Sequence, residues 1–260
     1  ETSNIVSNAH LINNGKMPVF DNSPSSDFFF LSANSPEKIL SAAIEMVTTR
    51  LPAFTGLSPL KIQVLAPMKS GVAGVINLNR QLQNHLNPAH PSKPEIAYGG
   101  QTFRVGDKVM HIANNYELEW QRFQDNGVVV HGAGVFNGDM GIVISVRPSV
   151  GELTVEFEDG RQVTYGAETL EELMLAYAIT VHKSQGCEFD AAVLALAGGS
   201  YMINTRNLLY TAVTRAKNYA VLIGQRETIY KMVKNTYTQT RYTMLQEMLR
   251  EFGEKMEIFL

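Results

Sequence analysis

The sequence predicts an α/β fold in which a parallel sheet with flanking helices is interrupted by a small β-barrel insertion. Strands and helices alternate from residue 28 to residue 86, which favours a parallel sheet. Residues 101–166 show only short strands and turns, as in a small barrel of the SH3-like type. The alternation returns after Thr169. We therefore expect three segments: the first part of the α/β domain over residues 1–99, the β insertion over 100–167 and the second part over 168–260.

The first segment starts with the end of a helix, because Ile5, Ala9 and Ile12 share one face and Gly15 follows as a stop. Ser35 is expected to cap a second helix, since serine accepts a hydrogen bond from a helix-start amide. In order, the expected elements are a helix within 1–20, a polar loop at 21–27, a strand at 28–31, a helix from 36, a strand at 61–66 and a helix at 72–86.

The rest of the chain is assigned in the same way. In the insertion, Gly160 follows Asp159 at a predicted hairpin turn. A long link over 117–134 holds Trp120, with an extra hairpin at 124–130 as one interpretation. The expected insertion strands are 104–111, 141–146, 153–157 and 162–165. Beyond it we expect strands at 173–179, 189–197 and 219–223, and helices at 206–217, 227–235 and 242–252.

Composition limits the function classes. Charged residues make up 18% of the chain and the net charge is −3, so any nucleic-acid site must be a local patch. Cys187 is the only cysteine, which favours a reducing compartment, and no Cys/His spacing suits a metal. The chain shows no export signal and no apolar run of ~20 residues, so we expect a cytoplasmic protein without a membrane segment. The start at Glu1 suggests a piece of a longer protein.

The most specific stretch runs from Tyr177 to Asp190, where polar residues follow a predicted strand directly. Ligands of open α/β sheets bind at the carboxyl ends of strands, and Gly186 would allow a close backbone approach. On local features alone, a capped turn with solvated His182 and Lys183 is an equally good interpretation.

Two further stretches carry weaker evidence. Leu208, Ala212 and Arg215 fall on one predicted helical face, where an arginine suits a phosphate; an ordinary helix end would also favour that arginine. Residues 66–75 predict a strand, a glycine-rich turn and a helix whose first amides could hold a phosphate. Taken alone, the second of these is better explained as a connection that needs glycine for its geometry.

In this order, these stretches resemble motifs of the RecD-like family of superfamily 1 DNA helicases, which includes the exodeoxyribonuclease V alpha subunit. Residues 180–188 resemble motif V, 210–216 motif VI and 67–74 the motif IV region. Residues 103–109 and 135–141 resemble the family's SH3-like insertion. The resemblance covers residues 1–235 and implies the second of two RecA-like motor domains. Family members have a shorter link where this chain has 117–134, which is either a tolerated surface insertion or a contact with DNA or a partner.

The resemblance also implies roles for individual residues. Arg215 would be the arginine finger that reaches the γ-phosphate of ATP. Gln185, Gly186 and Glu188 would lie at the same nucleotide, with Glu188 on the ribose. The residues implied in contacts with single-stranded DNA are Pro67, Met68, Lys69, Gly71, Thr180 and His182.

By the same resemblance, the cofactor is ATP with Mg²⁺, and the phosphate-cradling and magnesium-binding motifs belong to an N-terminal RecA-like domain that precedes Glu1. The expected activity is 5′-to-3′ translocation and unwinding by the full-length protein, with this piece inactive alone. Exonuclease subunits are further candidate partners. The alternatives are the helicase part of a conjugative relaxase and a non-catalytic module that binds DNA or protein.

Overall fold

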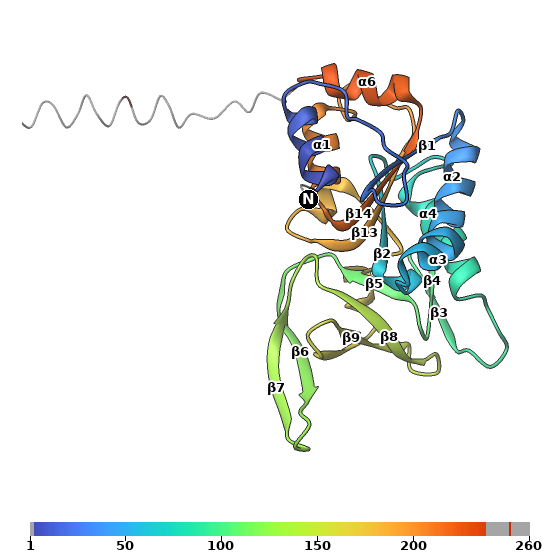
Figure 1. Ribbon diagram of the computed structural model, residues 1–260. Coiled ribbons are helices and arrows are strands. Elements are labelled where there is room, and N and C mark those ends of the chain that lie inside the picture. Colours follow the sequence, from blue (N-terminus) through green and yellow to red (C-terminus); the bar gives the residue numbers. More distant parts are fainter. Residues whose placement is uncertain (1–2, 238–249, 251–260) are drawn as a thin grey trace, which may run out of the picture.

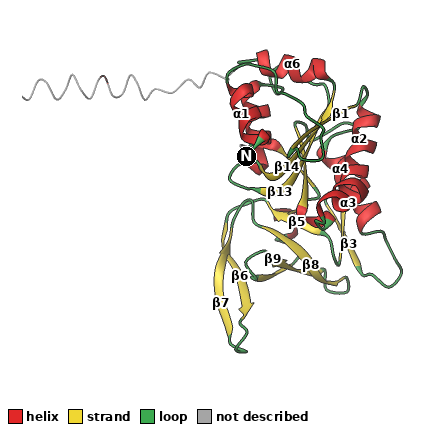
Figure 2. Ribbon diagram, viewed as in Figure 1, coloured by secondary structure: helices red, strands yellow, loops and turns green. Residues whose placement is uncertain are grey.

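The computed structural model describes residues 3–237 and 250. These form two parts, an upper one with all the labelled helices around a sheet and a lower one of strands and loops (Figures 1 and 2). The helix predicted over 242–252 lies outside the described residues, apart from Arg250.

The upper part is built on a five-stranded sheet in which every neighbouring pair is parallel, which confirms the predicted fold class. The strand order is β1 (Phe28–Ser32), β14 (Ala216–Gly224), β13 (Phe189–Leu196), β2 (Ile62–Ala66) and β12 (Ala178–Thr180). The β2 and β13 runs are almost wholly apolar because helices cover both faces.

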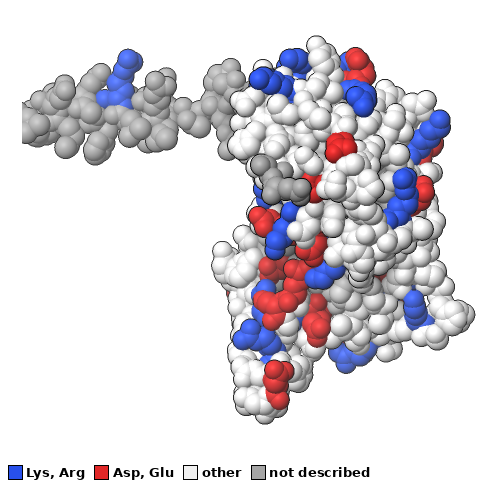
Figure 3. Space-filling view, viewed as in Figure 1, with Lys and Arg blue, Asp and Glu red and all other residues white. Residues whose placement is uncertain are grey.

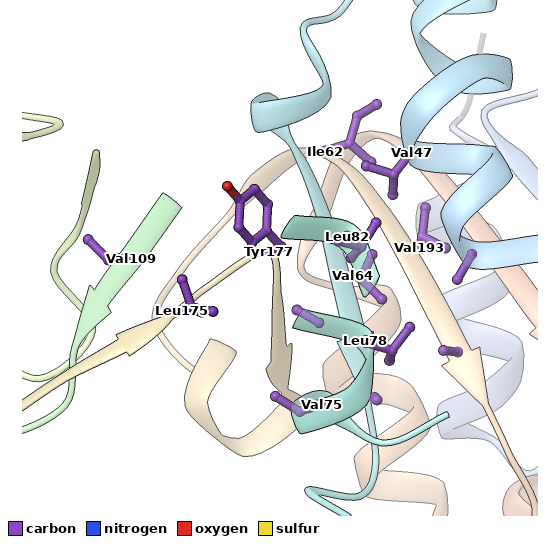
Figure 4. Close-up of a cluster of buried hydrophobic side chains, with 14 of the residues drawn as sticks. Val47, Ile62, Val64, Val75, Leu78, Leu82, Val109, Leu175, Tyr177 and Val193 are labelled. Carbon is purple, nitrogen blue, oxygen red and sulfur yellow. The ribbon is translucent and has the colours of Figure 1, made fainter. Parts of the chain in front are cut away.

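Alternate residues of the strands separate two cores. One core lies under α2 (Pro36–Glu45), its π-helical continuation (Met46–Arg50), α3 (Leu51–Thr55) and α4 (Val75–Leu86), and Figure 4 shows part of it. The other lies under α1 (Asn4–Asn13), α5 (Arg206–Val213) and α6 (Arg226–Lys234). The helix at the start of the chain is confirmed, with Ile5, Ala9 and Ile12 buried and Gly15 at φ +69°. Ser35 caps α2 as predicted, accepting from the Lys38 amide.

The insertion is a seven-stranded antiparallel sheet with a small separate hairpin. Its order is β11 (Leu173–Leu175), β5 (Lys108–His111), β8 (Met140–Arg147), β9 (Glu152–Phe157), β10 (Gln162–Tyr165), β6 (Asn115–Phe123) and β7 (Val129–Val135); β3 (Glu95–Tyr98) pairs with β4 (Gln101–Arg104). The β9–β10 hairpin turns at Gly160, φ +82°, as predicted. The hairpin interpretation of 124–130 is confirmed as the turn of β6 and β7, which extend well beyond it.

Several predicted elements have other bounds in the structure. The helix predicted from 72 begins at Val75, and the helix predicted to 217 ends at Val213 because the backbone turns there into β14. The strand predicted over 104–111 is broken by a turn at 105–107. The strand predicted over 173–179 is two strands, β11 in the insertion and β12 in the parallel sheet. The strand β3 has no counterpart among the predicted elements.

Residues 176–177 form the crossing between the two sheets, from β11 to β12, and buried polar side chains fix them in place. Gln63 Nε2 donates to the carbonyls of Ala176 (3.1 Å) and Tyr177 (3.2 Å). Lys108 Nζ donates to Gln63 Oε1 at 2.9 Å and to the Leu60 carbonyl at 2.8 Å. Burial lowers the pKa of Lys108 to about 8. These contacts hold the first residues of β5 against the parallel sheet.

A second buried group, the Asp107 carboxylate, ties the insertion to α4. It accepts from Gln83 Nε2 (2.6 Å), Asn87 Nδ2 (2.7 Å), the Arg104 amide (2.7 Å) and the Tyr177 hydroxyl (2.8 Å). Desolvation raises the pKa of Asp107 in spite of these donors. Figure 4 shows Tyr177 standing between the core side chains and Val109 and Leu175 of the insertion strands.

Both edge strands of the parallel sheet are covered by an asparagine side chain. Asn22 donates to the Phe30 carbonyl at 3.0 Å and accepts from the Phe30 amide at 2.9 Å, on β1. Asn79 does the same for Ala178 on β12, at 2.8 Å for each bond. Each amide side chain therefore takes the place of a neighbouring strand at one residue.

Candidate functional site

The two turns that the sequence singles out lie at one edge of the parallel sheet. Thr180 pairs with Ala66, so β12 and β2 end together, and residues 67–71 and 181–184 follow them. The register places both turns at the carboxyl ends of strands, where open α/β sheets bind ligands. Pro67 is buried, Met68 and Thr180 are partly buried, and Lys69, Gly71 and His182 are exposed.

The turn after β12 is a 3-10 helix (Val181–Ser184) capped by Thr180, whose hydroxyl accepts from the Lys183 amide at 3.4 Å. The capped-turn interpretation is therefore right about the geometry. Burial and the charge of Lys69 both lower the pKa of Lys183, so the two cations lie close enough to interact. Lys183 was not among the predicted site residues, although both lysines follow strands that end side by side.

The turn after β2 contradicts one expectation. The first amides of α4 are already bonded, Val75 to the Met68 carbonyl and Ile76 to the Lys69 carbonyl, each at 3.1 Å. They are not free to hold a phosphate. A Cβ at position 74 would lie 2.4 Å from the Ser70 carbonyl oxygen, so Gly74 is needed for the turn itself. The interpretation as a glycine-dependent connection is confirmed.

Residues 185–188 carry the chain from that edge back to the amino ends of the strands. Gly186 has φ +86°, in the left-handed region that favours glycine. Gln185 and Glu188 are exposed, and within residues 3–237 and 250 neither side chain has a hydrogen-bond or ionic partner. The Phe189 amide then donates to the Arg215 carbonyl at 2.9 Å, where β13 and β14 begin side by side.

Arg215 lies just after α5 and not on it, so the expectation that it shares a helical face with Leu208 and Ala212 is wrong. Its guanidinium is partly buried and donates only to neutral oxygens: the carbonyls of Thr211 (3.2 Å) and Cys187 (3.0 Å) and the Thr214 hydroxyl (3.2 Å). No ion pair involves Arg215 in the part of the chain that the structure describes. These bonds fix the guanidinium in place and leave its charge uncompensated.

A cavity of about 240 Å³ lies between the amino end of β13 and the insertion. Its lining residues are Gly138, Asp139, Met140, Phe157, Glu158, Asp159, Arg161, Cys187, Glu188 and Phe189. Arg161 is already paired with Asp139 (2.8 Å) and Asp159 (2.6 Å). On the face in Figure 3, acidic side chains gather where the two parts meet. The acidic walls disfavour a polyphosphate inside this cavity.

The structure thus brings the predicted site residues into two groups. Lys69, Thr180 and His182 lie at the carboxyl edge, and Glu188 and Arg215 lie at the amino ends of β13 and β14. The single segment 181–188 joins the groups. Over the described ranges 3–237 and 250, no cluster of three His, Cys, Asp or Glu could hold a metal ion, and no helix is long and apolar enough to cross a membrane.

Comparison with known proteins adds two matching families. Residues 78–157 match the SH3 domain of ATP-dependent RecD-like DNA helicases, and residues 175–223 match the UvrD-like helicase C-terminal domain. The ATP-dependent RecD2 DNA helicase of Deinococcus radiodurans is 33% identical over 192 residues, 74% of this chain and 24% of that protein. The RecBCD enzyme subunit RecD of Mycolicibacterium smegmatis is 28% identical over 191 residues, 74% of this chain and 30% of that protein.

Among solved structures, a Pif1 helicase from Bacteroides in complex with ADP-AlF3 and ssDNA aligns with 97% of this chain and 54% of that chain. The TM-score is 0.49 and the sequence identity 14%. The chain spans about a quarter of the length of the RecD-type relatives that it matches.

Proposed function

The chain is a relative of the RecD-like DNA helicases, with their SH3 domain and a UvrD-like helicase C-terminal domain, and on that premise we propose that it is the second motor domain of an ATP-dependent DNA helicase. The division into 1–99, 100–167 and 168–260 stays part of this proposal. The remaining three quarters of such a helicase would supply the first RecA-like domain. Exonuclease subunits stay candidate partners, because several relatives carry the name RecBCD enzyme subunit RecD.

The observation that carries the proposal is the uncompensated charge of Arg215. A structural arginine that is partly buried is usually paired with a carboxylate, because an unpaired buried charge is costly. Here three neutral oxygens orient the guanidinium without neutralising it. An arginine held in this way can stabilise the charge that develops on a transferring phosphoryl group, which fits an arginine finger. Gln185, Gly186 and Glu188 are proposed contacts of the same nucleotide.

The opposite group is proposed to hold single-stranded DNA. Lys69 and Lys183 bring two cations close enough to affect each other, which favours phosphate binding although the whole chain is acidic. Thr180 and His182 lie on the same turn as Lys183. Pro67, Met68 and Gly71 are proposed to line the path of the single-stranded DNA. These residues are proposed to contact phosphates and the faces of the bases, so little sequence preference is expected.

Coupling between the two groups would run through residues 181–188. A shift of the nucleotide against Glu188 or Arg215 acts on one end of this segment, and the DNA grip is at its other end. We propose that the cleft between the two domains closes on ATP and reopens after hydrolysis. This motion would shift the DNA-contact residues of this chain (the DNA grip, around Lys69, Thr180 and His182) relative to those of the first domain. Translocation from 5′ to 3′ is the expectation from the family resemblance.

The proposed cofactor is ATP with Mg²⁺. The described residues fit the phosphate end of the nucleotide, through Arg215, and do not fit the metal, since they contain no cluster that could hold one. Magnesium bound to ATP would neutralise charge on the phosphates. Its ligands are assigned to the first domain, so this chain alone should hydrolyse no ATP above background.

Replacement of Arg215 by alanine and by lysine in the full-length protein tests the proposal. Loss of the arginine finger should lower kcat for ATP hydrolysis by about 10³-fold. Binding of single-stranded DNA should stay within about twofold, because Arg215 lies at the other end of the 181–188 segment. Arg80→Ala, an exposed arginine on α4, is the matched control. Normal ATP hydrolysis by Arg215→Ala would favour the non-catalytic module instead.

A further inference from the structure

The loop between β13 and α5 (residues 197–205) presents two large side chains to solvent. Tyr201 is 67% exposed and Met202 is 61% exposed. The loop follows the carboxyl end of β13, which lies between β14 and β2 in the sheet. It therefore belongs to the same edge as the proposed DNA grip.

Hydrogen bonds fix the turn that carries Tyr201. The Ser200 carbonyl accepts from the amides of Ile203 (3.1 Å) and Asn204 (3.0 Å). The buried Asn235 donates from Nδ2 to the carbonyls of Tyr201 (2.6 Å) and Asn204 (2.9 Å). The Tyr201 ring also meets the Tyr237 ring edge-on, with centroids 6.0 Å apart. The aromatic ring thus stands on a turn whose backbone is held by four hydrogen bonds.

Contacts link this loop to the cations. A Cβ at Gly199 would lie 2.8 Å from Met68 Sδ, so the loop touches the turn that follows β2. The next residue, Lys69, shares its electrostatic environment with Lys183. The loop that carries Tyr201 therefore adjoins Met68 through Gly199, and Lys69 follows Met68 in the chain.

We propose that Tyr201 stacks on a base of single-stranded DNA while Lys69 and Lys183 bind its phosphates. The proposal rests on the helicase function proposed above and names an aromatic residue that would contact a base. An acidic chain with two lysines at this edge gains little from charge alone. Stacking on an aromatic ring supplies affinity without sequence preference, because every base has a π-face. Met202, exposed beside Tyr201, would extend the apolar surface.

The test compares two ligands that differ only in their bases. Binding of the full-length protein is measured for an oligothymidylate of about 15 nucleotides and for an abasic strand of the same length. Tyr201→Ala should weaken oligothymidylate binding about tenfold and leave abasic binding unchanged, whereas Tyr201→Phe should bind both as the wild type does. Tyr230→Ala is the control, since Tyr230 is exposed on α6 and lies against Lys234.

Equal affinity of Tyr201→Ala and wild type for oligothymidylate would overturn the inference, and so would an equal loss on both ligands. Lys69→Ala should weaken both ligands alike, which separates phosphate from base contacts. The helicase proposal is judged separately, by whether single-stranded DNA stimulates ATP hydrolysis of the wild type. Stimulated hydrolysis together with a silent Tyr201→Ala would defeat the stacking inference alone.

Discussion

Truncation of Asp107 to alanine should separate the insertion from the parallel sheet. Its carboxylate collects hydrogen bonds from Gln83 and Asn87 on the side of α4, from Tyr177 in the crossing between the sheets, and from the Arg104 amide within the insertion. Asp107 is fully buried, and alanine leaves the Arg104 amide and the Tyr177 hydroxyl without an acceptor. Gln83 and Asn87 each lose one bond and keep another, to the carbonyls of Thr102 and Val105. The substitution therefore removes a shared anchor of both parts.

Two opposing effects set the size of the loss. Each unsatisfied buried donor costs about 1–3 kcal/mol, so the Arg104 amide and the Tyr177 hydroxyl would cost roughly 2–6 kcal/mol, and the two bonds lost by Gln83 and Asn87 add about 1 kcal/mol each. Removal of a buried carboxylate relieves a desolvation penalty, the same effect that raises the pKa of Asp107. We expect a net loss of about 3–5 kcal/mol for Asp107→Ala. Asp107→Asn should lose about half as much, because it keeps one acceptor oxygen.

Urea unfolding followed by two probes is the assay. Trp120, the only tryptophan, lies on β6 and reports on the insertion, whereas far-UV circular dichroism reports on the helices of the other part. In the wild type the two midpoints should coincide. In Asp107→Ala the Trp120 transition should come at lower urea than the helical one. Coincident transitions with a loss below ~1 kcal/mol would refute the reasoning.

Three further predictions concern stability. Lys108 binds its proton less tightly in the folded state, with a pKa of about 8 against 10.5, so unfolding takes up protons between these two pH values. The free energy of unfolding of the wild type should therefore rise with pH over that window, by about 3 kcal/mol at most, as measured by urea midpoints. Lys108→Met should lack the rise. Asn79→Ala should cost about 2–3 kcal/mol for three lost hydrogen bonds, against less than ~0.5 kcal/mol for Arg80→Ala; equal losses would contradict this. Gly132→Val should displace the Trp120 ring, 2.3 Å from the position of a new Cβ, and shift its emission to longer wavelength with the helical signal intact.

The sequence predicted those features that depend on neighbouring residues. Ser35 caps α2 and Gly160 turns a hairpin because each effect needs only a few adjacent positions. The resemblance to RecD-like helicases, carried by short ordered motifs, is confirmed by the comparisons. The roles assigned to single residues within those motifs stay predictions.

Long-range partners could not be predicted in the same way. Residues 173–179 are apolar throughout, so no residue marks the point where the chain leaves one sheet and enters another. The bonds of Gln63 and Asp107 join residues that are up to 114 and 70 positions apart. Arg215 was expected on a helix because the helical spacing continues past Val213. The hydrogen bond from the Phe189 amide to the Arg215 carbonyl, which precedes β14, is a tertiary contact that the local sequence does not show.

The asparagine amides at the two margins of the parallel sheet have a consequence for whatever adjoins this chain. At Phe30 and at Ala178 the outward main-chain groups are already satisfied, so a neighbouring domain cannot join by lengthening the ladder through those residues. Attachment at those two residues must then rely on side chains and loops. In the motor proposed above, an interface of that kind would separate and re-form in each ATP cycle without breaking a row of main-chain hydrogen bonds. The same asparagines would also hinder polymerisation of purified chains through those two residues.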